Sequence, residues 1–230
     1  MGLHLSPERR ALDALVRRQV FDVFVETGRP PLPLELAKAS GECEQKVQEA
    51  LLRLEKARIL KLFPDRSDVL AAHPFSAIPT PFRVESRGRS WWGACAWCAL
   101  SIPAALQSDA MVFTVCADCQ RPINWTVKSG YVSGTSSVVH IAVPAAHWWD
   151  DVVFSCNTIL AFDSEEHLAS WCSVHRREQG AILSLNQTWG LSKSLYWDLL
   201  QSDWKQKTLE DLASAFARAG LHGRFWDLHS

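Results

Sequence analysis

The N-terminal part of the chain repeats apolar residues with the period of an α-helix. From Pro7 to Thr27 apolar side chains recur every three or four positions, and Gly28 ends the pattern. The same spacing predicts a short helix over 34–39 and a longer one over 44–58, joined by a Ser40–Glu42 turn. Three helices in this order predict a helix-turn-helix arrangement.

Two short apolar segments, 59–63 and 69–72, follow the helices and flank the polar stretch Asp65–Asp68. Apolar runs separated by turn residues are typical of a β-hairpin. A hairpin placed after three helices completes the outline of a winged-helix module.

The segment 73–82 contains several prolines and is expected to be extended, because proline excludes helical backbone at the residue before it. We interpret this segment as a linker. The sequence therefore predicts a winged-helix-like domain over 1–80 and a second domain over 81–230.

The second domain begins with strand patterns and ends with helical ones. Strands are expected at 112–115, 123–127, 138–143 and 152–154, and helices at 164–178, 191–201 and 209–219. Because the strands precede the helices and do not alternate with them, the pattern predicts an α+β fold with a mixed or antiparallel sheet.

Charge and hydropathy exclude several classes of protein. The chain has 24 Lys and Arg against 25 Asp and Glu, so a strong polyanion-binding protein is not expected. The most apolar run, 94–106, is interrupted by Ser101 and Pro103 and is shorter than the roughly 20 residues of a membrane span. The first residues lack the pattern of a secretory signal, and we expect a cytoplasmic protein without a membrane partner.

Seven cysteines provide the candidate chemistry. Cys95-Ala-Trp-Cys98 and Cys116-Ala-Asp-Cys119 have the spacing of a four-thiolate zinc site, although only the second pair lies among polar turn residues. Alternatively, Cys98 pairs with a distant cysteine, and Cys156, expected at the end of a strand, is the natural candidate. Two thiolates with an open position bind soft cations such as Hg(II), Cu(I) or Zn(II).

Several segments resemble the alkylmercury (organomercurial) lyase family. Ala96–Leu100, which opens an apolar helix, and the preceding segment 73–84 resemble the family's first active-site region. Cys119–Ile123 resembles the segment of its third, structural cysteine, and Val153–Phe162 resembles its second active-site motif. The resemblance covers most of the chain and weakens beyond about residue 190.

The resemblance implies a winged-helix-like domain followed by a mixed catalytic domain that cleaves a carbon–mercury bond by protonolysis, giving a hydrocarbon and Hg(II). By this comparison Cys98 and Cys156 are the catalytic and metal-binding thiols. Cys95 and Cys116 lie outside the family pattern, and together with Cys119 they are candidate accessory thiols. Ser101 occupies the position of the family's usual Asp. A hydroxyl is a poor proton source at neutral pH, so a cysteine thiol or a water held by Ser101 would have to supply the proton.

The implied substrate is a small organometallic compound, and a mercuric reductase or another thiol acceptor would receive the product. The resemblance implies no required cofactor and Hg(II) as the bound product, while the cysteine spacing leaves a structural zinc or adventitious copper open. Two other functions remain as alternatives: a non-catalytic protein that binds Cu, Hg or Zn through thiolates, and a metal-responsive winged-helix regulator. Mixed charges along 44–58 disfavour nucleic acid as a partner.

Overall fold

The computed structural model describes residues 6–64 and 68–229 and divides into two compact units, Met1–Ile78 and Pro79–Ser230. The predicted turn at Asp65–Asp68 lies almost entirely outside the described residues. Each unit is described separately.

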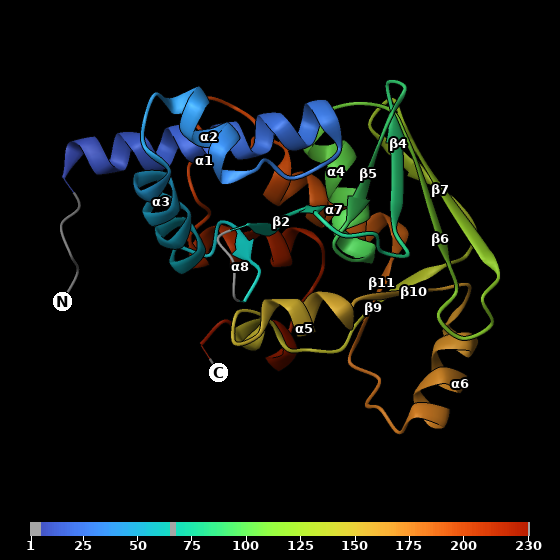
Figure 1. Cartoon of the computed structure of the whole chain (residues 1–230). Helices are drawn as coiled ribbons and strands as arrows, with labels where there is room; N and C mark the ends of the chain where they lie inside the picture. The colour runs from blue at the N-terminus through green and yellow to red at the C-terminus, as the bar shows by residue number, and fades with distance from the viewer. Residues whose placement is uncertain (1–5, 65–67, 230) are drawn as a thin grey trace. The chain divides into compact units, whose positions relative to one another are not determined.

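The N-terminal unit begins with the three predicted helices, which lie side by side (Figure 1). They are α1 (Pro7–Thr27), α2 (Pro33–Ser40) and α3 (Glu44–Lys56). The hydroxyl of Ser6 accepts a hydrogen bond from the Arg9 N–H and starts α1, and Gly28 ends it in a left-handed conformation with φ 73°. The helix predictions for this unit are confirmed to within two residues.

Three short antiparallel strands follow, β1 (Lys61–Leu62), β2 (Val69–Ala72) and β3 (Phe75–Ser76). Phe75 stacks on Phe24 of α1 with ring centroids 5.6 Å apart, and both side chains are fully buried. This contact joins the strands to the apolar face of the first helix and forms one core.

The C-terminal unit contains two sets of strands, and all their pairings are antiparallel. Five strands pair in the order β5-β4-β6-β7-β8, and three pair in the order β10-β9-β11 (Figure 1). The strands are β4 (Arg83–Ser86), β5 (Arg89–Gly93), β6 (Ala110–Val115), β7 (Pro122–Lys128), β8 (Tyr131–Ser133), β9 (Val138–Ile141), β10 (Leu160–Phe162) and β11 (Ala181–Ser184). The predicted α+β class with antiparallel sheets is confirmed.

Five helices and two short 3₁₀ turns complete this unit. They are α4 (Ala96–Leu106), η1 (Ala145–His147), α5 (Val152–Asn157), α6 (Glu165–His175), α7 (Leu185–Tyr196), α8 (Leu209–Arg218) and η2 (Arg224–Trp226). Every residue of α4 is buried, and α7 packs along it. The most apolar run of the sequence is thus a core helix, and among the described residues no helix is long and apolar enough to cross a membrane.

Two predicted elements differ from the structure. The expected strand at 152–154 is the start of α5, because the carboxylate of Asp151 accepts the Phe154 N–H at 2.9 Å and caps a helix. Cys156 therefore lies in a helix and not at a strand end. Helix α7 begins at Leu185, before the expected 191, because Ser184 and Gln187 form a capping box there.

The end of β5 lies unusually close to α4. A Cβ atom at Gly93 would be 2.8 Å from the backbone nitrogen and Cα of Ala99, so only glycine fits without movement. This close approach fixes the first turn of α4 against the strand.

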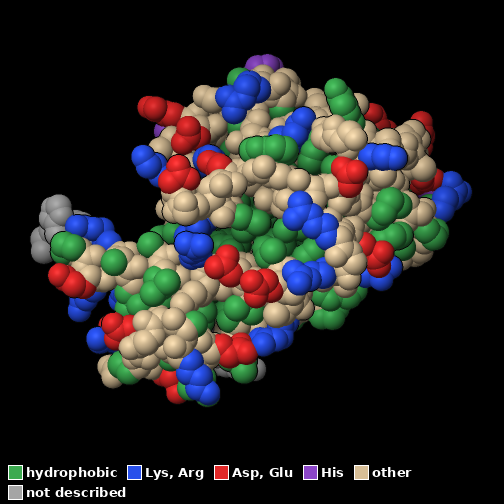
Figure 2. Space-filling view, turned by 90° about the horizontal axis from the view of Figure 1, so that it is seen from above, with side chains coloured by type: hydrophobic (Ala, Val, Ile, Leu, Met, Phe, Trp, Pro, Cys, Tyr) green, Lys and Arg blue, Asp and Glu red, His purple; other side chains and the backbone are tan. Residues whose placement is uncertain are grey.

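Charges of both signs are mixed over the visible surface. On the face shown in Figure 2, Lys and Arg side chains are interspersed with Asp and Glu side chains. This agrees with the net charge of −1.

Candidate thiol site

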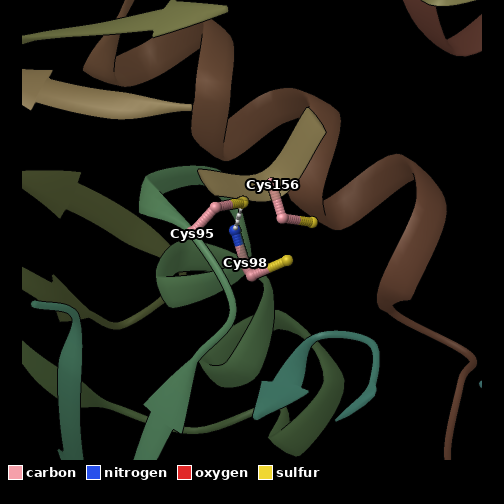
Figure 3. A group of neighbouring side chains, drawn as sticks. All are labelled: Cys95, Cys98 and Cys156. Carbon is pink, nitrogen blue, oxygen red and sulfur yellow. Dashed lines mark hydrogen bonds between the residues drawn. The ribbon is translucent and has the colours of Figure 1, made fainter. Parts of the chain in front are cut away.

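Three cysteines from two segments meet in the C-terminal unit (Figure 3). Cys95 precedes α4 as its N-cap, Cys98 lies in the first turn of the same helix, and Cys156 lies in α5. The three sulfur atoms all lie within 4.8 Å of one another. The structure thus brings together the two cysteines that the sequence pairs, Cys98 and Cys156, and adds Cys95, which the sequence ranks as accessory.

Two hydrogen bonds fix the start of α4, one within the helix and one to the segment that contains Cys156. The N–H of Cys98 donates to the sulfur of Cys95 at 3.3 Å, and the N–H of Ala96 donates to the carbonyl of Ile159 at 3.2 Å. The second bond connects the start of α4 to the residues that follow Cys156.

Access to the three sulfurs is unequal. Cys95 is fully buried and Cys98 is 2% exposed, whereas Cys156 is half-buried. A molecule that enters from solvent therefore meets Cys156 first.

The pKa values of Cys98 and Cys156 are both raised. The neighbouring Cys156 and Cys95 thiols, together with burial, hold the pKa of Cys98 well above its ordinary value. Cys95 and burial likewise raise the pKa of Cys156, although Cys98 acts on it in the opposite direction. Since a second negative charge is unfavourable in so small a buried volume, Cys98 and Cys156 keep their protons at neutral pH.

Aromatic side chains surround the first turn of α4. The ring of Trp97 lies 6.1 Å from that of Tyr196 and 5.4 Å from that of Trp148, measured between centroids. Burial, and then the nearby thiols of Cys98, Cys95 and Cys156, raise the pKa of the Tyr196 phenol well above its usual value, so it remains neutral. Sequence reasoning missed Tyr196, because no local pattern connects a residue of α7 to cysteines at the start of α4.

Ser101 is fully buried one turn after Cys98, and its hydroxyl makes contacts within α4 and with α7. Its oxygen lies 3.0 Å from the carbonyl oxygen of Trp97 and 3.1 Å from the hydroxyl of Ser192. Ser192 in turn donates to the carbonyl of Thr188 at 2.9 Å. The Ser101 hydroxyl thus takes part in a chain of hydrogen bonds that joins α4 to α7.

The remaining two cysteines of the predicted zinc pattern belong to a different cluster. Cys116 and Cys119 lie with His167 of α6, and one ligand atom from each is within 4.8 Å of the others. The expectation of one site formed by both Cys-x-x-Cys pairs is therefore wrong. Cys95 and Cys98 lie at the start of a helix, whereas Cys116 and Cys119 lie in a turn between two strands. The spacing of the cysteines in the sequence does not reveal that the two pairs face different sites.

A hollow of about 510 Å³ lies beside α5 and α6, with His140, Phe154, Trp171 and His175 among its lining residues. No cysteine of the described residues lines it. The three thiols are thus enclosed by the core and not by this hollow.

The structure is thus an antiparallel α+β protein with a buried cluster of three thiols. The chain matches the crystal structure of the mercury-bound form of MerB2 with a TM-score of 0.66 and 26% identity, over 86% of this chain and 93% of that one. The family model of MerB, alkylmercury lyase, matches residues 75–197, more than half of the chain.

This protein therefore belongs to the alkylmercury lyase family. An alkylmercury lyase from Staphylococcus epidermidis is 22% identical over 169 residues, which cover 72% of this chain and 74% of that protein. The family resemblance of the sequence is confirmed. Two groups of side chains, Cys95, Cys98 and Cys156 and Cys116, Cys119 and His167, have ligand atoms close enough to share one ion.

Proposed function

We propose that this protein cleaves the carbon–mercury bond of an organomercurial at Cys98 and Cys156. The observation that carries the proposal is the convergence of their sulfur atoms, with that of Cys95, within 4.8 Å. Soft thiolates bind Hg(II) tightly, and two of them at this separation can hold one ion between them. Membership of the alkylmercury lyase family supports the same chemistry.

The first step is thiol exchange at the more accessible sulfur. An organomercury group carried by a small thiol transfers to Cys156, so that a sulfur–mercury bond forms and the carrier thiol leaves with the Cys156 proton. The second step engages Cys98. Its sulfur binds the mercury, the carbon–mercury bond breaks, and the Cys98 proton passes to the departing carbon. The products are a hydrocarbon and Hg(II) bound to two cysteine sulfurs.

The proton requires a source other than a carboxylate, because Ser101 occupies the usual Asp position and its hydroxyl is engaged with Trp97 and Ser192. The raised pKa of Cys98 keeps the needed proton on the attacking thiol until mercury displaces it. Cys95 places a third sulfur beside this pair, within reach of the mercury when the carbon leaves.

The experiment is hydrocarbon release from phenylmercury or methylmercury by reduced protein in excess thiol. We expect release by the wild type and none above background by Cys98→Ser or Cys156→Ser. Cys43→Ser is the matched control, because Cys43 is exposed and belongs to neither cysteine cluster. Equal release by all four proteins would refute the assignment of the thiol pair.

A second candidate function is retention of a soft metal without bond cleavage. It is favoured by one observation: within the described residues, no carboxylate joins the group of three sulfurs. In the same assay, tight binding of mercury to the wild type without hydrocarbon release would select this function.

We propose no nucleic-acid partner for the N-terminal unit. Basic side chains on and beside α3 are occupied by acidic ones: Arg53 lies 2.7 Å from Asp13, Lys46 lies 2.8 Å from Glu42, and Lys61 lies 2.7 Å from Glu55. These pairs leave α3 and its surroundings with charges of both signs, whereas phosphate binding favours an excess of cations. The expected partner is instead a thiol acceptor or a mercuric reductase that removes the Hg(II) product.

A further inference from the structure

A second cluster of metal-binding side chains lies outside the thiol site, where the turn between β6 and β7 meets α6. Cys116 is fully buried, Cys119 is exposed, and His167 is half-buried. One ligand atom from each lies within 4.8 Å of the others. We propose that Cys116, Cys119 and His167 form a zinc site.

The turn has the backbone geometry of a metal-binding knuckle. The Cys116 N–H donates to the carbonyl of Arg121 at 2.9 Å, and the Gln120 N–H donates to the carbonyl of Cys116 at 3.0 Å. Gln120, directly after the second cysteine, adopts φ 59°, in the left-handed region. The chain is thus folded back so that the two cysteines are directed to the same side.

The distances fit a tetrahedral ion. Bonds of about 2.3 Å to sulfur and about 2.1 Å to nitrogen put the two ligand atoms about 3.6 Å apart at a tetrahedral angle. Nδ1 of His167 lies 3.7 Å from the sulfur of Cys116. Oδ2 of Asp118 lies 3.2 Å from the same nitrogen. After a rotation of its side chain this carboxylate supplies the fourth ligand, which closes the site as in structural zinc sites.

The position of the site indicates its role. The Ala117 N–H donates to the carbonyl of Ala161 at 3.0 Å, and Arg121 pairs with Asp163 at 2.6 Å, so the turn already contacts β10. An ion held between this turn and His167 adds a third connection to the segment that follows Cys156. The zinc is therefore structural: it stabilises the segment next to the thiol site and takes no part in cleavage.

The test uses the full chain, kept reduced with a phosphine, loaded with Zn(II) and desalted before the metal is quantified. We expect about one zinc per chain in the Cys98→Ser/Cys156→Ser double variant, which lacks the chelating thiol pair, and at least as much in the wild type. Added to that double variant, Cys119→Ser and His167→Gln should each retain at least tenfold less, whereas Cys43→Ser in the same background should retain the full amount. Co(II) in place of zinc should give the visible and thiolate charge-transfer bands of a tetrahedral site, lost in the same two variants.

Any of three results would overturn the proposal. The first is unchanged zinc in Cys119→Ser and His167→Gln, and the second is loss of zinc in the Cys98→Ser/Cys156→Ser variant alone. The third is a wild-type protein that takes up no zinc while its cysteines are reduced. Since the readout is metal content and spectra, it is independent of hydrocarbon release.

Discussion

Replacement of Cys95 separates two roles of one sulfur atom. The sulfur accepts the Cys98 N–H as the N-cap of α4, and it is also the third member of the buried thiol cluster. Serine can cap the helix but is a poor ligand for a soft metal, whereas alanine does neither. Cys95→Ser therefore removes only the metal ligand, whereas Cys95→Ala removes both the ligand and the helix cap, and the difference between the two variants gives the contribution of the cap.

The expected loss of stability follows from the contacts. Loss of the cap costs about 1 kcal/mol. Removal of a buried sulfur leaves a small cavity that costs about 1 kcal/mol more. In a chain of this size each kcal/mol lowers the melting temperature by roughly 2–4 °C. Cys95→Ala should thus melt about 4–8 °C below the wild type, and Cys95→Ser should recover about half of that difference.

The pKa values of Cys98 and Cys156 should change in the same way in Cys95→Ser and in Cys95→Ala. Cys95 is the main cause of the raised pKa of Cys156 and contributes to that of Cys98, so both values should fall towards the ordinary cysteine range in either variant. The assay is a pH titration of thiolate absorbance near 240 nm, with Cys98→Ser and Cys156→Ser to assign each step. Unchanged ionisation of the remaining pair in Cys95→Ser would refute the view that the three thiols act as one coupled cluster.

Three further predictions concern the fold and the proton source. Gly93→Ala should lower the unfolding free energy by about 1–3 kcal/mol, because its Cβ would collide with the backbone of α4, whereas Gly190→Ala, which has open space, should raise it by up to about 1 kcal/mol in urea denaturation. The hydrogen bond from Arg29 lowers the pKa of Glu35 to about 2, so wild-type stability should fall as the pH decreases from about 4.5 to 2, and Glu35→Gln should lose less over this window. Equal acid curves for the two proteins would contradict this. Ser101→Asp should increase hydrocarbon release by about 10²-fold, because a carboxyl group transfers protons better than the Cys98 thiol, and it should destabilise the protein by about 1–3 kcal/mol because position 101 is fully buried. An unchanged release rate in a folded variant would show that the thiols already supply the proton without limiting the reaction.

The local features of the fold could be predicted from the sequence. Gly28 caps the end of α1, and α8 begins at Leu209, both as expected. These helix ends are determined by apolar periodicity and by capping residues that lie next to them in the sequence. The segment around Val152 and Phe154 is wrongly predicted as a strand because β-branched and aromatic residues favour strands. Asp151 decides the outcome, since its carboxylate caps the helix at a place where apolar patterning alone suggests an extended chain.

Only part of the candidate site could be predicted, because its residues come from segments far apart in the sequence. The pairing of Cys98 with Cys156 follows from the family resemblance, whereas the inclusion of Cys95 depends on how the start of α4 turns towards α5. His167 joins Cys116 and Cys119 only because α6 packs near the β6–β7 turn. Local sequence patterns do not specify contacts between segments far apart in the sequence, so these contacts could not be predicted from this one sequence.

The odd number of sulfurs in the buried group has a consequence for redox chemistry. Thiols within 4.8 Å of one another are close enough that a modest movement allows two of them to join as a disulfide. Because the number is odd, one thiol would remain, able to bind an organomercury group through a single bond but unable to chelate Hg(II). Two-electron oxidation would therefore convert a site that chelates Hg(II) into one that offers a single thiol. The redox state of the surroundings would determine which of these two forms of the site is present.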